Sequence, residues 1–213
     1  MIVTEVVLLA TLHHLHSEVR GYSFEELGHL VTKLEPAALV VELQSSEIAG
    51  FPENPIKGSK VEYNKSILPT AQKLKLPVYA LEPSGKERDE ILKVYEKAWK
   101  DAAKNPSYEA FSKYTDLLFS QLMRYWQGPL DVNSEVTIES FRLKHSYQEA
   151  LLSVDTPSWE QWNEHFLESI LATADIHRGK RLVVTVGAEH VYWLKDRLSK
   201  KSEVRLISLS EAL

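Results

Sequence analysis

Residues 2–12 have the sequence IVTEVVLLATL, a nearly unbroken apolar run rich in β-branched side chains. Strands of a parallel sheet that are covered on both faces have this pattern. A stretch with helical spacing of apolar residues follows and ends at Pro36, and a second apolar run, AALVVEL, occupies residues 37–43. Strand, helix and strand in this order predict a βαβ unit with parallel strands.

The same strand pattern returns at residues 76–81, 181–187 and 203–209, with the sequences LPVYAL, RLVVTVG and EVRLISL. Between the first and second of these runs, from residue 84 to 178, the apolar residues have helical spacing instead. We therefore expect a single α/β domain over residues 1–213, in which a mostly parallel sheet of about five strands is flanked by helices. The stretch 84–178 is expected to be a four-helix insertion between the third and fourth strands.

The composition excludes several classes of protein. The chain has 213 residues, of which 44% are hydrophobic and 26% charged, values typical of a globular domain. Its 25 basic and 30 acidic residues give a net charge of −5, which argues against nucleic acid as a partner. The chain has no cysteine, so disulfides, thiolate nucleophiles and cysteine-ligated metals are excluded.

The N-terminal run lacks the basic segment of a signal peptide, and no apolar run approaches the roughly 18 residues of a membrane span. We therefore expect a cytoplasmic protein that acts on a small molecule or a peptide.

Histidine and carboxylate side chains follow four of the predicted strands. His13 comes after the first strand, Glu42 and Glu82 end the second and third, and Glu189 and His190 follow the fourth. In a parallel sheet the carboxyl ends of the strands meet at one edge, which is where ligands bind. These side chains are therefore expected to converge on one site.

Imidazole nitrogen and carboxylate oxygen suit a divalent metal such as Mn, Zn, Co or Fe. His13, Glu42 and His190 are the candidate metal ligands and catalytic residues, since a bound metal would lower the pKa of a water molecule and deliver hydroxide. Glu82 or Glu189 would then act as a general base or orient a ligand imidazole. The competing interpretation is structural: the histidines lie in solvated turns, and Glu42 forms a salt bridge to an Arg or Lys.

Several further features have simpler structural interpretations. The segment 44–60, rich in Gly, Pro and Ser, is expected to be a lid loop without secondary structure. His14 should point away from His13, because neighbouring side chains of a strand alternate. Structural roles are also expected for His16, Glu82 and Glu189. Solvated positions are expected for His29, His145 and His177. Core packing, rather than a stacking platform, is expected for Trp159, Trp162 and Phe166.

Three segments in this order resemble motifs of the TraB/PrgY–Tiki–GumN group, which is related to the erythromycin esterases and the haem-binding ChaN proteins. They are LLATLHHLH near the N-terminus, ALVVEL, and RLVVTVGAEHVYWLKDRL near the C-terminus. The family pattern of Gly-Thr-x-His, Glu-Leu and Gly-x-x-His corresponds to 10–13, 42–43 and 187–190. For the Tiki branch the resemblance implies a metal-dependent peptidase with both histidines and the Glu at the metal. For the esterase branch it implies water activation by the equivalent residues.

Three functional hypotheses follow. The first is a metal-dependent or water-activating hydrolase, of peptidase or esterase type, built on His13, Glu42 and His190. The second is a non-catalytic protein that binds a ligand or haem in the same strand-end pocket, with a His or Tyr as axial ligand. The third is a structural or regulatory protein in which the exposed faces of the helical insertion matter more than the pocket.

Overall fold

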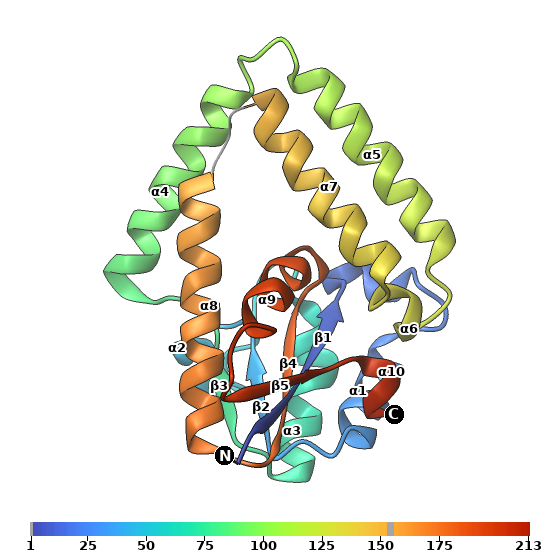
Figure 1. Cartoon of the computed structure of the whole chain (residues 1–213), viewed down its shortest axis with the longest axis vertical. Helices are drawn as coiled ribbons and strands as arrows, with labels where there is room; N and C mark the ends of the chain where they lie inside the picture. The colour runs from blue at the N-terminus through green and yellow to red at the C-terminus, as the bar shows by residue number, and fades with distance from the viewer. Residues whose placement is uncertain (1, 153–155) are drawn as a thin grey trace.

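The computed structural model describes residues 2–152 and 156–213 and confirms the α/β fold (Figure 1). Five parallel strands form one sheet in the order β3-β2-β4-β1-β5. The strands are β1 (Thr4–Thr11), β2 (Ala38–Val41), β3 (Val78–Ala80), β4 (Arg181–Gly187) and β5 (Val204–Ile207). Each predicted apolar run therefore contains a strand, and the strands are up to a few residues shorter than the runs.

The register of the central strands sets where the sheet ends. Thr11 of β1 pairs with Gly187 of β4, and Val41 of β2 pairs with Thr185 of β4. Side chains on both faces of β4 are buried, which explains why its sequence is a continuous apolar run instead of an alternating one. The residues that follow β1, β2 and β4 consequently meet at one edge of the sheet.

Helices cover both faces of the sheet (Figure 1). On one face α1 (Phe24–Lys33) packs with the π-helical turn η2 (Tyr63–Ile67) and with α3 (Leu68–Leu74). On the other face α8 (Thr156–Ile176) packs against α9 (Val191–Leu198). The remaining short elements are η1 (His13–Ser17), α2 (Ser45–Gly50), η3 (Ala188–His190) and α10 (Leu209–Ala212).

The segment between β3 and β4 is helical, and it rises from the sheet as two arms (Figure 1). In one arm α4 (Gly85–Ala102) lies beside α8, and in the other α5 (Tyr108–Tyr125) lies beside α7 (Glu135–Leu152). A short fifth helix, α6 (Pro129–Val132), was not predicted. It begins where Gly128-Pro129 ends the preceding helical pattern, because proline is favoured in the first turn of a helix.

Local details differ from the sequence prediction at the helix ends. The pattern Ser23-Phe24-Glu25-Glu26 predicts a cap at the start of α1, and the Ser23 side chain does accept a hydrogen bond from the Glu26 backbone N. Ser84 precedes α4 without a side-chain cap, and the Glu87 carboxylate pairs with His165 of α8. The sequence also predicts a third insertion helix over about 134–153 and Thr156 as the cap of the fourth. Residue 153 and the side chain of Thr156 lie outside the described residues.

Two further boundaries also moved. The segment 44–60 is not structureless, because α2 forms within it. The last strand ends before Ser208, which caps α10, and Leu209 begins that helix. Among the helices of the described residues, none is both long and apolar enough to cross a membrane.

Candidate functional site

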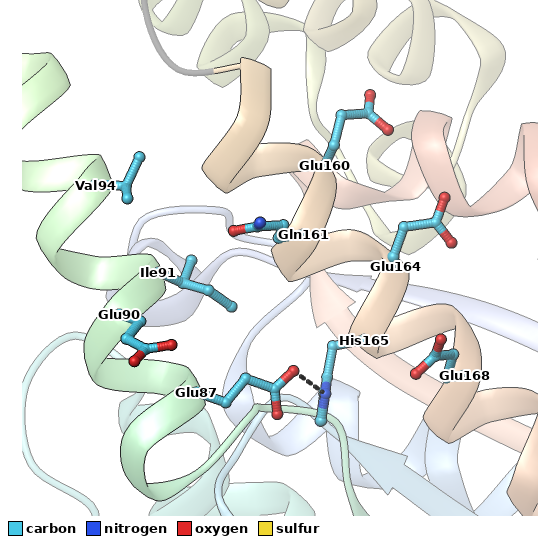
Figure 2. Close-up of a pocket in the computed structure, with 9 residues that line it drawn as sticks. All are labelled: Glu87, Glu90, Ile91, Val94, Glu160, Gln161, Glu164, His165 and Glu168. Atoms are coloured by element: carbon cyan, nitrogen blue, oxygen red, sulfur yellow. Dashed lines mark ion pairs between the residues drawn. The ribbon is translucent and has the colours of Figure 1, made fainter.

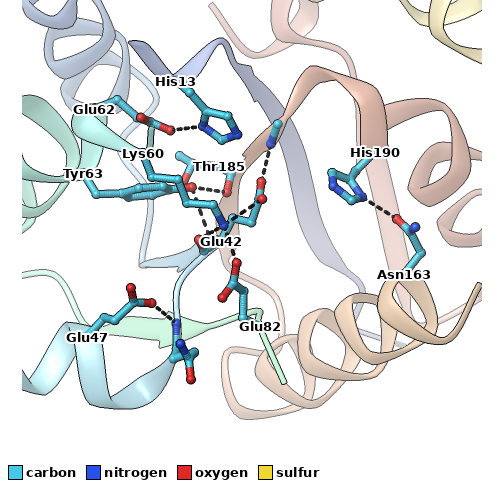
Figure 3. A network of polar contacts seen from close by, with 12 residues as sticks. His13, Glu42, Glu47, Lys60, Glu62, Tyr63, Glu82, Asn163, Thr185 and His190 are labelled. Atoms are coloured by element: carbon cyan, nitrogen blue, oxygen red, sulfur yellow. Dashed lines mark hydrogen bonds and ion pairs between the residues drawn. The ribbon is translucent and has the colours of Figure 1, made fainter. Parts of the chain in front are cut away.

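A pocket of about 360 Å³ opens at the carboxyl edge of the sheet. His13, which follows β1, and His190, which follows β4, both line it together with Gly187, Trp159 and Ser59. Figure 3 shows His13 and His190 on either side of Glu42, which follows β2. The structure therefore brings together the three residues that the sequence placed at one site.

Glu62 holds the His13 ring. The Nδ1 of His13 lies 2.7 Å from Oε1 of the buried Glu62. Because a carboxylate only accepts hydrogen bonds, Nδ1–H donates and Nε2 is left on the far side of the ring, toward Gly187. Burial lowers the pKa of His13, but the hydrogen bond to Glu62 and the negative charges of Glu42 and Glu62 outweigh burial and raise the pKa above its usual value.

Asn163, a buried residue of α8, holds the His190 ring. Its Nδ2 donates to the backbone O of Trp159, which turns its Oδ1 toward His190 Nδ1 at 2.8 Å. Nδ1–H of His190 therefore donates, and Nε2 lies on the side of the ring away from Asn163 (Figure 3). Trp159 stacks on the same ring, with centroids 4.5 Å apart. Burial lowers the pKa of His190, although Glu42 and Glu189 act against this shift.

Glu42 is ionised and fixed in orientation. Its side chain is buried, with Oε2 accepting a hydrogen bond from Gly187 N at 2.6 Å and Oε1 lying 2.9 Å from Lys60 Nζ. Burial alone would raise the pKa of Glu42, but the charges of Lys60, His190 and His13 and the Gly187 hydrogen bond lower it to about 2. A fixed negative charge therefore lies beside both imidazoles.

The backbone of Glu42 is held by a residue of the π-helical turn. Tyr63 Oη accepts a hydrogen bond from Glu42 N and donates to Thr185 O, both at 3.1 Å. Glu42 N also donates to Thr185 O at 3.2 Å, so the buried hydroxyl adds to a direct backbone bond between the end of β2 and β4 beneath the site (Figure 3).

Sequence reasoning missed four residues of this network: Lys60, Glu62, Tyr63 and Asn163. The first three lie in a segment whose apolar residues follow no clear period, so no pattern placed them near the strand ends. Asn163 offered a signal in the sequence, since it is a polar residue within the aromatic stripe Trp159, Trp162 and Phe166. The structure shows that it is fully buried.

The geometry does not fit the predicted divalent metal at His13, Glu42 and His190. Both imidazoles have the tautomer that a metal ligand needs, with Nδ1 held by an oxygen acceptor. The oxygens of Glu42, however, are engaged by the Lys60 ammonium and the Gly187 amide, which is the salt-bridged arrangement considered as the alternative. Within residues 2–152 and 156–213, no group of three or more His, Asp and Glu side chains is arranged to hold a metal ion.

Glu189 lines the pocket but is paired away from the two candidate imidazoles. Its Oε2 lies 2.6 Å from Lys144 Nζ and 3.5 Å from His145 Nε2, both on α7. His145 was expected to be solvated, and this is wrong, because its side chain is only 12% exposed and stacks on Trp159 with ring centroids 4.2 Å apart. Burial lowers the pKa of His145 to about 4. Trp159 is thus a wall of the pocket between two imidazoles as well as part of the core.

His14 also departs from the prediction, because it lines the same pocket as His13. The strand ends at Thr11 and the next residues form the 3-10 turn η1, so the alternation of a strand does not apply to them.

The other histidines have mixed outcomes. His16 is structural as expected: its Nδ1 donates to Tyr22 O and its Nε2 accepts from Leu12 N. The side chain of His29 is 70% exposed, in agreement with the prediction. His177 is not simply solvated, because its Nε2 bonds to the hydroxyl of Tyr79.

A second pocket, of about 600 Å³, lies between α4 and α8 and is lined by glutamates and His165 (Figure 2). The ion pair marked in Figure 2 joins Glu87 Oε1 to His165 Nδ1 at a distance of 3.3 Å. The pocket lies apart from the sheet edge and contains none of the predicted site residues.

Comparison of the chain with protein-family models, with curated proteins and with solved structures gave no match.

Proposed function

We propose that this protein is a hydrolase that activates water with a pair of histidines and cleaves an ester or amide bond of a small molecule or peptide. The observation that carries the proposal is that His13 and His190 line one pocket while their environments shift their pKa values in opposite directions. Two titratable groups whose pKa values are pushed apart in one site are suited to act as an acid and a base.

His190 is the general base. Its lowered pKa keeps the imidazole neutral near pH 7, and its Nδ1–H is held by Asn163, so Nε2 accepts a proton from the attacking water. The hydroxide oxygen forms the new bond to the carbonyl carbon as that proton moves to Nε2.

His13 is the general acid. Its raised pKa favours the form that carries a proton on Nε2, and this proton hydrogen-bonds to the substrate and passes to the leaving oxygen or nitrogen as the C–O or C–N bond breaks. Return of the proton from His190 to His13 through solvent then restores the starting state.

Glu42 serves both steps without accepting a proton. Its carboxylate, ionised at any pH near neutrality, stabilises the protonated His13 at the start and the imidazolium that forms at His190. Such a fixed charge in a site with little water is effective because it needs no reorganisation during the reaction.

The experiment compares three substitutions of the same type: His13→Gln, His190→Gln and, as a matched control, the exposed His29→Gln. Hydrolysis of a panel of 4-nitrophenyl esters and internally quenched peptides is measured for each folded variant. We expect kcat/KM to fall about 100-fold or more for His13→Gln and for His190→Gln, the magnitude typical of a lost acid or base, and to stay unchanged for His29→Gln.

Retention of wild-type turnover in both folded site variants would contradict the proposal. A wild-type protein that hydrolyses no member of the panel but gives a haemin Soret band lost in both site variants would support the ligand-binding alternative instead.

We also propose that the protein is related to the TraB/PrgY–Tiki–GumN group, that it is cytoplasmic and that it has no nucleic-acid partner. These parts rest on the motifs and the composition alone.

A further inference from the structure

Three oxygen atoms surround the ammonium group of Lys60. They are the backbone O of Glu42 at 2.9 Å, Oε1 of Glu42 at 2.9 Å, and Oε1 of Glu82, with which Lys60 forms a close ion pair. An ammonium group has three N–H bonds, so each has an acceptor here. Figure 3 shows the Lys60 side chain reaching between Glu42 and Glu82.

The two carboxylates are held by the protein alone. Glu42 Oε2 accepts from Gly187 N, and Glu82 Oε2 lies 3.9 Å from Nε of Arg88. The side chains of Glu42 and Glu82 are 6% and 8% exposed, so bulk water hardly solvates either carboxylate. Removing one partner from such a buried arrangement would leave uncompensated negative charge.

The acceptor set is also the one that a hard divalent cation prefers. Mg²⁺, Mn²⁺ and Ca²⁺ bind carboxylate and carbonyl oxygens, and the atoms around Lys60 Nζ are two carboxylate oxygens and one carbonyl oxygen. A divalent ion would therefore compete with the Lys60 ammonium for the position between Glu42 and Glu82.

We propose that Lys60 is the built-in cation of this site: its ammonium occupies the position between Glu42 and Glu82 that a divalent metal would otherwise fill, and it thereby fixes Glu42 beside His13 and His190. Lys60 is a positioning residue, since it acts through Glu42. The inference concerns cation binding and stands whether or not the protein is a hydrolase.

Isothermal titration of the full-length protein with MnCl₂ tests this directly. Wild type and Lys60→Arg, which keep a cation in place, should bind Mn²⁺ weakly or not at all. Lys60→Ala, checked for folding by circular dichroism, should bind one Mn²⁺ at least about tenfold more tightly than wild type. Adding Glu82→Gln to Lys60→Ala should remove that gain, because it neutralises one of the two carboxylates but leaves both histidines unchanged.

Two results would overturn the inference: tight, stoichiometric Mn²⁺ binding by the wild type, or a folded Lys60→Ala variant that gains no affinity. A second measurement covers the case in which Lys60→Ala does not fold. In wild type the ammonium resonance of Lys60, assigned by its loss in Lys60→Arg, should be observed by ¹⁵N NMR in slow exchange with water and should persist with equimolar Mg²⁺. Rapid exchange, or loss of that resonance on addition of equimolar diamagnetic Mg²⁺, would contradict it.

Discussion

Gly187 lies where two reactive side chains approach the backbone. A Cβ atom on this residue would lie 3.3 Å from both Glu42 Oε2 and His13 Nε2, closer than ordinary van der Waals contact. The absence of a side chain therefore lets the carboxylate accept the Gly187 N–H and lets the imidazole face the same point. At the scale of single residues, the site depends on such close approaches to the ends of the strands.

The Tyr63 hydroxyl is the residue-scale feature most open to test. Tyr63→Phe removes one of the two acceptors of the buried Glu42 N–H, the other being Thr185 O at 3.2 Å, and it removes the hydroxyl that donates to Thr185 O. Because the Glu42 N–H keeps its bond to Thr185 O, no buried donor is left unpaired, and we expect the loss of the hydroxyl's own hydrogen bonds to lower the free energy of unfolding by about 0.5–1.5 kcal/mol. Urea unfolding followed by circular dichroism measures this change.

The control for that substitution is Tyr108→Phe, the same chemical change at an exposed position on α5. Its effect should be within about 0.5 kcal/mol of zero. Equal effects of the two substitutions would show that the Tyr63 hydroxyl does not hold β2 and β4 together.

At the scale of elements, one short segment supplies much of the site. Lys60, Glu62 and Tyr63 lie within four residues at the start of the helix that contains the π-helical turn η2. A π turn widens the helix and changes the direction of the side chains around it, and such turns are common at functional sites. Here the three side chains reach Glu42, His13 and Thr185 respectively.

The helix α7 joins its arm to the sheet. Phe141 is buried in the same apolar cluster as the strands, Arg142 forms a double ion pair with Asp196 of α9, and Lys144 pairs with Glu189 of η3. The arm is therefore fastened to the edge that carries the pocket.

Truncating Phe141 tests that attachment. Phe141→Ala should lower the free energy of unfolding by about 3–5 kcal/mol, since it removes a buried ring and leaves a cavity. Leu143→Ala on the same helix is the control, because Leu143 is 50% exposed, and its effect should be within about 0.5 kcal/mol. A Phe141→Ala variant as stable as Leu143→Ala would show that α7 contributes little to the common core. Chemical denaturation of both variants under identical conditions gives the comparison.

At the scale of the whole molecule, the sheet and the convergence of its strand ends could be predicted from the sequence. Continuous apolar runs mark buried parallel strands, and the topology of such a sheet places His13, Glu42 and His190 at one edge. The partners of these residues could not be predicted in the same way. Glu62 and Lys60 are brought in by a segment without a regular apolar period, and Asn163 comes from the helix α8.

The same limit explains the errors. His14 and His145 were judged by local patterns, whereas their positions follow from the 3-10 turn η1 and from the packing of α7 on Trp159. Whether Glu42 has an oxygen free for the predicted metal likewise depends on where Lys60 lies. Contacts between segments distant in sequence decide such questions.

The most direct test of the roles of His190 as base and His13 as acid is an NMR titration of their imidazole resonances in the wild-type protein. The resonances are assigned with the two His→Gln variants. We predict a pKa above 6.5 for His13 and below 6.5 for His190. Any hydrolytic activity should then be lost as the pH falls through the His190 value, which protonates the base, and as it rises through the His13 value, which deprotonates the acid. If both rings titrate together near 6.5, or if their order is reversed, the assignment of His190 as base and His13 as acid is contradicted.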